Sequence, residues 1–586
     1  MEAIRTLYSK SSNSSSQHDS WSTLVPFGRP WGWGSEKANS SETRINYLST
    51  HALSGGCFNT LNLPNHCLST MVDELQDYTF SPSSDPSTWT RKCYGLESFA
   101  STMSENLDGF PFLTTTISIK PAYDRGILEP AVKAAWIALR HSLPAIAVKS
   151  SRLPAADNRF TLTYHVPKET GELQTWVNET VFFTDEVKDV YDVHKNLKDE
   201  RWWKPSADHL VGELHVSPVE DGWQFSVVFN HNSIDGRSGF GILNELLGKL
   251  VPILEGSTTL ISELPWGEET KRLPPASKVI NTKAKALPKK DQPPLPLSQP
   301  TPWTWPPVKI SSPINRDVSA LVALPIETTS KLHTVSKLHG RTISQVVTAL
   351  SILAHTETSL KAAAEAGPER FAAVSLGFKE SEVYRMRTFT NYRHKFPEPY
   401  NTLSSETPGP LSTFDGMPLF LRMGPIRKFF TIDDVTSTAS VNSTELTDVF
   451  WDELVNATAK SWKDHDLSLH GFATREEESQ GIIHSFDPNI LNVPVLITSS
   501  IGDMGRLDIF DNYLPSRARG NGTLTVADTI CGQRVRVPAI MNLFWQYDGK
   551  LSCQWFTGGE WTTREQLCHV VDSFERWIGI FVGRDQ

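Results

Sequence analysis

A histidine followed by an aspartate and a glycine is the part of this sequence best suited to chemistry. His231 begins the run His231-Asn-Ser-Ile-Asp235-Gly236. An imidazole titrates near neutral pH, so a histidine at the mouth of a channel can accept a proton from a substrate hydroxyl or amine. The Asp235 carboxylate, on the other side of a short turn, is suited to fastening that turn through a buried arginine. His231 is therefore predicted to act as a general base, and Asp235 to be structural.

The residues around the motif predict a strand before it and a helix after it. Trp223, Phe225, Val227 and Phe229 alternate with the residues between them, which is the period of a strand. Beyond the motif, apolar residues recur at helical spacing: Ile242, Leu243, Leu246, Leu247, Leu250 and Val251. We therefore expect His231 where a strand ends and a turn begins. A histidine that caps a strand in an ordinary core, and an Asp-Gly pair that only makes a turn, are the alternatives.

The pattern His-x-x-x-Asp-Gly, as it stands at residues 231–236, resembles the active-site motif of the HXXXD acyltransferase superfamily. That superfamily includes plant-type alcohol acyltransferases, trichothecene acetyltransferases, chloramphenicol acetyltransferase and the condensation domains of peptide synthetases. The resemblance implies an α/β (α+β) fold of two chloramphenicol acetyltransferase-like lobes, each a mixed sheet flanked by helices, with the active-site tunnel between them. It also implies acyl transfer from a thioester, with His231 as the base, Asp235 as a structural residue and Gly236 as part of the active-site motif.

Two further segments resemble parts of the same superfamily. The predicted helix at 128–143 ends in Arg140-His-Ser-Leu, which looks like a motif of condensation-type enzymes whose arginine helps to fix the histidine loop. Arg140 is thus a candidate partner for Asp235, although an arginine at a helix C-terminus is also favoured by the helix dipole. A strand at 493–500 looks like the one that borders the channel, so Ser499 and Ser500 are candidates to contact the thioester or its oxyanion. Ordinary turn serines are the alternative.

The sequence departs from these relatives in ways that favour a diffusible donor. Condensation domains usually carry two adjacent histidines, and Asn230 takes the first place here. No carrier-protein or adenylation segment is recognisable. The late Asp-Phe-Gly-Trp-Gly motif of plant-type enzymes is absent, with only a faint echo in Gly502-Asp-Met-Gly505. We therefore expect acyl-CoA as a co-substrate, with no permanently bound cofactor and no metal.

Composition changes along the chain predict its organisation. We expect a disordered N-terminus at 1–20, an N-terminal lobe at 21–264, a proline-rich crossover at 265–313 and a C-terminal lobe at 314–586. Within the C-terminal lobe we expect an irregular insertion at about 379–445, and we expect this insertion to set the selectivity for the acceptor. The crossover could instead recruit a partner domain. Other expected elements are strands at 113–119, 160–165, 173–182, 318–325 and 372–377, helices capped by Thr342 with Gln345 and by Thr563 with Gln566, and a hairpin that turns at Asp548-Gly549.

The composition excludes several classes of protein. With 39% hydrophobic and 21% charged residues among 586, the chain is of soluble globular type, and a net charge of -10 argues against binding nucleic acid. The six cysteines are scattered, so neither a zinc site nor a disulfide framework is indicated. We see no secretory signal and no membrane span, and we expect a cytoplasmic monomer.

These observations lead to one expected function and two alternatives. The expected function is an O-acyltransferase that moves an acyl group, acetyl in the first instance, from acyl-CoA to a hydroxyl of a hydrophobic small molecule such as a secondary metabolite. One alternative is a condensation-type enzyme that forms an amide or ester from a carrier-bound thioester. The other is a non-catalytic member that uses the fold for binding.

Overall fold

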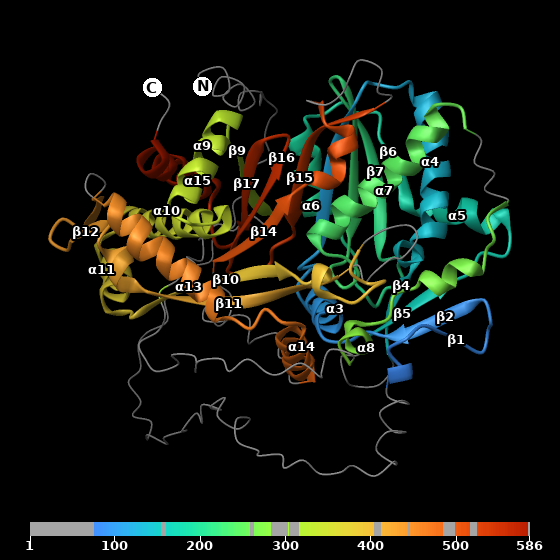
Figure 1. Ribbon diagram of the computed structural model, residues 1–586, viewed down its shortest axis with the longest axis horizontal. Helices are drawn as coiled ribbons and strands as arrows, with labels where there is room; N and C mark the ends of the chain where they lie inside the picture. Colours follow the sequence, from blue (N-terminus) through green and yellow to red (C-terminus); the bar gives the residue numbers. More distant parts are fainter. Residues whose placement is uncertain are drawn as a thin grey trace, which may run out of the picture. The chain divides into compact units, whose positions relative to one another are not determined.

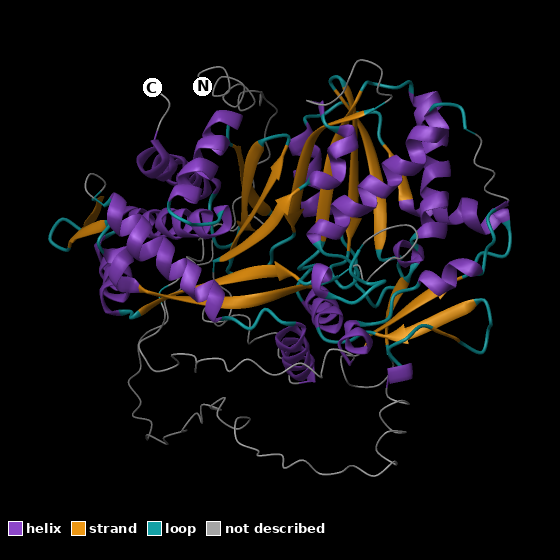
Figure 2. Ribbon diagram, in the orientation of Figure 1, coloured by secondary structure: helices purple, strands orange, loops and turns teal. Residues whose placement is uncertain are grey.

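The fold is built around two mixed β-sheets, one of which carries the histidine motif (Figures 1 and 2). The computed structural model describes residues 75–153, 160–257, 263–282, 303, 316–402, 412–442, 446–484, 499–515 and 524–583. Among these residues, one sheet has five strands in the order β15-β3-β8-β7-β6, and another has six in the order β11-β10-β14-β16-β17-β9. Two smaller sheets have the orders β1-β2-β5-β4 and β12-β13.

The five-stranded sheet carries the histidine motif at the end of one strand. Its strands are β15 (Thr525–Gln533), β3 (Leu113–Lys120), β8 (Gly222–Phe229), β7 (Gly212–Val219) and β6 (Val181–Phe183). β6 is parallel to β7, and the other pairs are antiparallel. The strand and helix expected on either side of the motif are therefore confirmed, since β8 precedes it and α7 (Gly236–Leu254) follows it.

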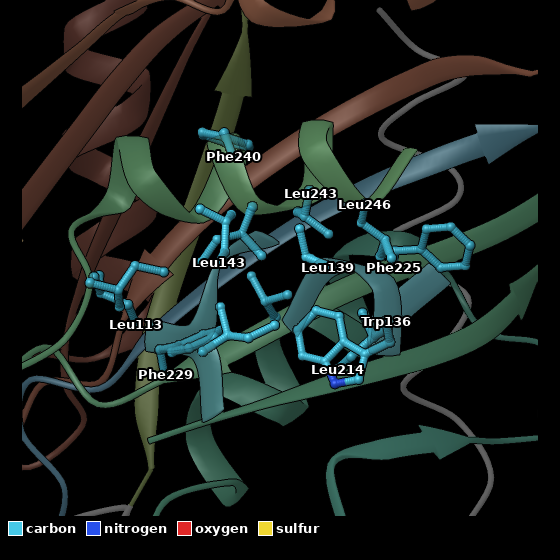
Figure 3. Close-up of a cluster of buried hydrophobic side chains, with 14 of the residues drawn as sticks. Leu113, Trp136, Leu139, Leu143, Leu214, Phe225, Phe229, Phe240, Leu243 and Leu246 are labelled. Atoms are coloured by element: carbon cyan, nitrogen blue, oxygen red, sulfur yellow. The ribbon is translucent and has the colours of Figure 1, made fainter. Parts of the chain in front are cut away.

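Helices cover both faces of this sheet. α4 (Arg125–Ser142) and α7 lie on one face, while α6 (Val190–Glu200) covers the other (Figure 1). Figure 3 shows the packing on the first face, where side chains of both helices meet those of the strands; labelled there are Leu113, Trp136, Leu139, Leu143, Leu214, Phe225, Phe229, Phe240, Leu243 and Leu246. Burying each such side chain stabilises the fold by about 1.5–3 kcal/mol. The turn with His231 is thus anchored at both ends in a well-packed core.

The six-stranded sheet is built from the second half of the chain. Its strands are β11 (Phe414–Arg422), β10 (Val383–Asn391), β14 (Ser500–Arg506), β16 (Ile540–Tyr547), β17 (Lys550–Gly558) and β9 (Asp317–Ala323). α10 (Ile343–Glu365) and α15 (Arg564–Ile578) pack on one face, and both begin with the predicted capping boxes. The hairpin at Asp548-Gly549 is also confirmed, with both residues at positive φ.

β15 links the two sheets, because it comes from the second half of the sequence but pairs with β3. The core beneath the histidine motif accordingly contains side chains from both halves, including Met541, Leu543 and Phe556 of the six-stranded sheet. The described residues, which run from 75 to 583, all belong to one compact unit. The division into lobes at 265–313 remains a prediction.

The remaining elements surround these sheets. They are β1 (Ser81–Pro82), β2 (Thr88–Lys92), β4 (Lys149–Arg152), β5 (Phe160–His165), β12 (Phe430–Asp433), β13 (Thr438–Val441), α3 (Leu96–Asn106), α5 (Thr170–Thr180), α8 (Ser277–Thr282), α9 (Ile326–Leu338), α11 (Pro368–Glu380), α12 (Met423–Arg427), α13 (Asn456–Asp464) and α14 (Leu469–His484). No helix in the described ranges is long and apolar enough to cross a membrane.

Three local predictions were wrong. The segment 173–182 is mostly helix α5, whose buried residues Leu173, Trp176, Val177 and Thr180 have helical spacing. The segment 372–377 lies within α11, which starts at a proline in the first helical turn. The predicted irregular insertion at 379–445 contains β10 and β11.

The sequence does not make β10 evident, because arginines stand between the residues that are buried at every second position. Tyr384, Met386 and Thr388 are buried at every second position, but Arg385 and Arg387 lie between them. Several other predictions lie outside the described residues: the disordered N-terminus at 1–20, most of the proline-rich crossover, and the first part of the strand predicted at 493–500.

Candidate active site

The turn after β8 holds the His231 ring in one tautomer. The Asn230 N–H donates to the carbonyl of Val211 (2.9 Å), which continues the sheet pairing up to the motif. His231 Nδ1 lies 2.6 Å from the carbonyl oxygen of Ile234. A carbonyl can only accept, so Nδ1 carries the hydrogen and donates it, and the lone pair of the neutral ring is on Nε2. This is the tautomer that a base acting through Nε2 needs.

Burial keeps this ring uncharged. His231 is only 6% exposed, and loss of hydrating water lowers its pKa to about 4, although the hydrogen bond to Ile234 and the charge of Asp235 act in the opposite direction. The imidazole is therefore neutral at physiological pH and ready to accept a proton.

Asp235 joins the start of α7 to the second half of the chain. Its Oδ1 accepts hydrogen bonds from the backbone N–H and the hydroxyl of Ser238, both at 2.8 Å, so it is the N-cap of the helix. Its Oδ2 accepts from the N–H of Thr413 at 2.9 Å and from its hydroxyl at 3.0 Å. These contacts hold the turn in place and are those of a structural carboxylate.

Arg393, rather than Arg140, lies beside Asp235. Its Nη2 is 3.7 Å from Oδ2 of Asp235 and donates to the hydroxyl of Ser238 at 2.7 Å. Arg140 instead donates to the carbonyl of His165 at 2.8 Å, and its guanidinium lies over the rings of Tyr164, Trp176 and Trp266. The predicted pairing of Arg140 with Asp235 is therefore wrong, because a carbonyl and three aromatic rings take up that guanidinium.

Gly236 allows segments from both halves of the chain to approach closely. A Cβ at this position would lie 2.6 Å from Cε of Met504 on β14 and 3.2 Å from Sγ of Cys531 on β15. Arg237 fastens the same contact, since its Nη1 donates to the carbonyls of Met504 (2.7 Å) and Arg506 (3.0 Å). The histidine turn is thus clamped against β14.

A cavity of about 70 Å³ reaches the His231 ring. Leu113 and Gln533 line it from the five-stranded sheet, and Asn391, Gly502 and Leu543 line it from the six-stranded sheet. By itself it has room for only a few water molecules.

A larger cavity of about 720 Å³ adjoins this one. The two share the lining residues Arg237, Phe389, Thr390, Asn391, Asp503 and Met504. The small cavity at His231 is therefore continued, at these shared residues, by space large enough for a small molecule.

Ser499 and Ser500 do not line the cavity at His231. The hydroxyl of Ser499 lies 3.1 Å from that of Tyr384, within the core of the six-stranded sheet. The residues of β14 that reach the cavity are Gly502, Asp503 and Met504, a few positions later. β14, which begins at the last residue of the predicted strand, borders the site through residues beyond that prediction.

Four residues of the site were missed by sequence reasoning: Arg393 and Thr413 at Asp235, and Asn391 and Gln533 in the cavity wall. Three of them lie in the segment interpreted as an irregular insertion. A signal was present for Asn391 and Gln533, since each is a polar residue at the last position of a strand. Such strand ends are common places for functional side chains.

Comparisons with solved structures identify the fold. The trichothecene 15-O-acetyltransferase of Fusarium sporotrichioides is similar over 86% of this chain and 98% of its own, with a TM-score of 0.61 and 13% identity. The condensation domain of the monacolin K polyketide synthase is similar over 84% of this chain and 97% of its own, with a TM-score of 0.51 and 11% identity. The chain has the chloramphenicol acetyltransferase-like fold. No protein-family model matches the sequence, and no curated protein matches it in sequence.

The chloramphenicol acetyltransferase-like fold was thus predicted correctly from one six-residue motif and the elements around it. At 11–13% identity the comparisons show the fold alone. The residues at the cavity determine which chemistry the protein can perform.

Proposed function

We propose that this chain is an O-acyltransferase that moves an acyl group, acetyl in the first instance, from acyl-CoA to a hydroxyl of a hydrophobic small molecule. The observation that carries the proposal is the neutral His231, held by the Ile234 carbonyl with its lone pair on Nε2, in the wall of a cavity lined from both sheets. The fold is shared with an enzyme described as a 15-O-acetyltransferase, which supports the same reaction class.

His231 would move one proton in each direction. Its Nε2 accepts the proton of the acceptor hydroxyl as that oxygen attacks the thioester carbonyl carbon. The tetrahedral intermediate then collapses, the C–S bond breaks, and the imidazolium returns the proton to the departing thiolate. Such proton transfer contributes about 10²–10⁴-fold to the rate. No charge remains on the protein at the end of the cycle.

The side chains that line the two cavities differ in polarity. This difference supports a hydrophobic acyl acceptor and an acyl donor with a polar arm. Next to His231 the wall contains the apolar side chains Leu113, Phe389, Met504, Met541 and Leu543. The larger cavity contains many uncharged polar side chains, together with Arg237, Arg393, His394 and Asp503. The uncharged ones include Ser238, Asn244, Thr342, Ser344, Gln345, Asn401 and Thr402. Amides and hydroxyls of this kind suit the pantetheine arm of coenzyme A, so we assign the larger cavity to the donor.

Condensation from a carrier-bound thioester is the second candidate, because the fold is also that of a condensation domain. The pantetheine arm is common to both donors, so the cavities fit either. We favour acyl-CoA because Asn230 replaces the first histidine of the condensation motif. We keep a cytoplasmic location and a monomeric state as parts of the proposal.

The test is thiol release from a panel of acyl-CoAs in the presence of metabolite extract, read with a thiol reagent and by product mass. The purified chain should release thiol and form acylated products, and His231→Ala should do neither while its melting temperature stays close to that of the parent. His569→Ala, a histidine on α15 away from the cavity, is the matched control. Activity with a carrier thioester alone would favour the condensation alternative, and no activity with any donor would favour a binding role.

A further inference from the structure

A transferase of this kind needs hydrogen-bond donors for the carbonyl oxygen as well as a base. Negative charge develops on that oxygen when the acceptor adds to the thioester, and donors fixed in advance stabilise it most. Ser499 and Ser500 do not line the cavity, so they cannot supply this. The other polar side chains in the wall of the His231 cavity are therefore the candidates for these donors.

Gln533 offers a buried carboxamide in this wall. It is the last residue of β15, is only 7% exposed and lines the cavity with His231. The two residues before it show which way it points. A Cβ at Gly532 would meet His194 on the α6 face, whereas Cys531 lies against Gly236 and Thr115 on the α7 face. Side chains alternate along a strand, so Gln533 points to the face of His231.

The Gln533 carboxamide has no hydrogen-bond partner among the residues that the structure describes. Its polar atoms are not among the fully enclosed polar atoms that lack a partner, and the residue lines the cavity. A buried amide left in this state would cost about 1–3 kcal/mol unless water or a ligand satisfies it. The Gln533 carboxamide is therefore available to hydrogen-bond a ligand in the cavity.

Asn391 offers a second carboxamide from the opposite sheet. It is the last residue of β10 and lines both cavities. Its Oδ1 accepts from the N–H of Arg393 at 2.8 Å and lies 3.1 Å from the hydroxyl of Thr413. With the oxygen held in this way, the Nδ2 end is the one presented to the cavity. Asn391 is thus oriented as a hydrogen-bond donor to the cavity. The same Thr413 hydroxyl also lies within hydrogen-bond distance of Asp235 Oδ2.

We propose that the carboxamide N–H groups of Gln533 and Asn391 form the oxyanion site of this enzyme, which would make both of them catalytic residues. The inference rests on the proposed acyl transfer. As the acceptor oxygen bonds to the thioester carbon, the π electrons of the carbonyl move to its oxygen, and the two N–H groups donate to that oxyanion. When the oxyanion collapses, the C–S bond breaks and the thiolate takes its proton from His231.

The kinetic test uses variants that remove or invert the donors. Gln533→Met and Asn391→Leu keep similar volumes without N–H groups, and Gln533→Glu puts an acceptor-only carboxylate at the site. With acetyl-CoA as donor, we expect kcat to fall by about 10²–10³-fold in each of the first two variants, with KM for acetyl-CoA nearly unchanged. Gln533→Glu should be slower than Gln533→Met, because its negative charge opposes the oxyanion. Gln554→Met, a buried glutamine that does not line the cavity, is the matched control and should keep the parent kcat.

A second measurement works without turnover and separates this inference from the proposed function. In the His231→Ala background, the infrared carbonyl stretch of bound acetyl-CoA should shift to lower frequency, and Gln533→Met should reverse the shift. Normal kcat in both Gln533→Met and Asn391→Leu, in a parent that is active and depends on His231, would overturn the oxyanion site alone. An unshifted carbonyl would also overturn it. A parent that neither binds nor turns over any acyl-CoA would overturn the proposed function and this inference together.

Discussion

The carboxylate of Asp235 accepts a 3.0 Å hydrogen bond from the hydroxyl of Thr413, although 178 residues separate the two in sequence. The Thr413 N–H donates to the same oxygen at 2.9 Å. Through this pair, the turn that carries His231 is fastened to the segment that leads into β11. The aspartate of the motif thus acts on the site by holding two distant parts of the chain together.

Asp235→Asn should lower stability and activity together. An amide can accept at only one of its two ends, so one set of donors, at Ser238 or at Thr413, would face an NH₂ group. We expect a loss of about 1–3 kcal/mol in the free energy of unfolding, measured by denaturant titration. Thr413→Val, which removes one hydroxyl at constant shape, should cost about 1 kcal/mol. An Asp235→Asn protein with parent stability would contradict the role given to this carboxylate.

A double-mutant cycle should couple Asp235 to Arg393 and not to Arg140. Arg393 lies 3.7 Å from the carboxylate, whereas Arg140 is held by His165 and aromatic rings. Asp235→Ala with Arg393→Met should therefore deviate from additivity by about 0.5–3 kcal/mol in unfolding free energy. For Asp235→Ala with Arg140→Met, the two single changes in unfolding free energy should sum to that of the double variant within about 0.5 kcal/mol. Coupling to Arg140 in place of Arg393 would show that the pairing has been assigned to the wrong arginine.

Gly236→Ala should overpack the contact with β14. The new methyl group would lie 2.6 Å from Cε of Met504 and 3.2 Å from Sγ of Cys531, so side chains must move. We expect a loss of about 1–3 kcal/mol in unfolding free energy. Met504 has a flexible side chain, so Met504→Ala should restore part of this loss when it is combined with Gly236→Ala. If Met504→Ala gave no recovery, the close approach would not be the cause.

The pH profile of acyl transfer should reflect the buried state of His231. Its pKa is lowered to about 4, so the base form is present above that value and is lost as the pH falls through it. We expect kcat/KM to stay level between roughly pH 6 and pH 8 and to decline only near pH 4. The measurement is kcat/KM for acetyl-CoA across that range. A decline centred on the ordinary histidine value, about 6.5, would mean that the ring is hydrated in the working enzyme.

Three buried histidines should make the fold sensitive to mild acid. Burial lowers the pKa of His194, His231 and His355 to about 3, 4 and 3. The unfolded chain takes up protons below about pH 6.5 while the folded chain does not, so stability is fully present above that pH and falls as the pH drops. Each histidine contributes up to about 1.4 kcal/mol per pH unit in that window. Denaturant titrations at pH 7 and pH 5 should show this loss, and His355→Leu should reduce it; an unchanged pH dependence in that variant would contradict the assignment.

The parts of the fold that follow from local pattern could be predicted from the sequence. β3, β8, α7 and the hairpin at Asp548-Gly549 all have clear periodicity or turn residues. His231 could be placed at a strand end for the same reason. The helices α5 and α11 were misread because short apolar runs fit a strand as well as a helix.

The partners within the site could not be predicted, because they depend on long-range pairing. Nothing near Asp235 in sequence indicates Thr413 or Arg393, and β15 joins β3 across several hundred residues. The hydroxyl of Ser499 and its place at a strand predict a contact with the thioester, but the register of β14 carries Gly502 and Met504 to the cavity instead. A strand can be recognised from its alternation, whereas its register and its neighbours follow from packing.

Chemical rescue of a protein that lacks the His231 ring tests the central claim most directly. The measurement is thiol release from acetyl-CoA by His231→Ala, with and without imidazole in the buffer, as a function of pH. If His231 is the base, the variant should be inactive alone, imidazole should restore part of the rate, and the restored rate should follow the titration of the added imidazole. Thiol release at the parent rate by His231→Ala without imidazole would contradict the account.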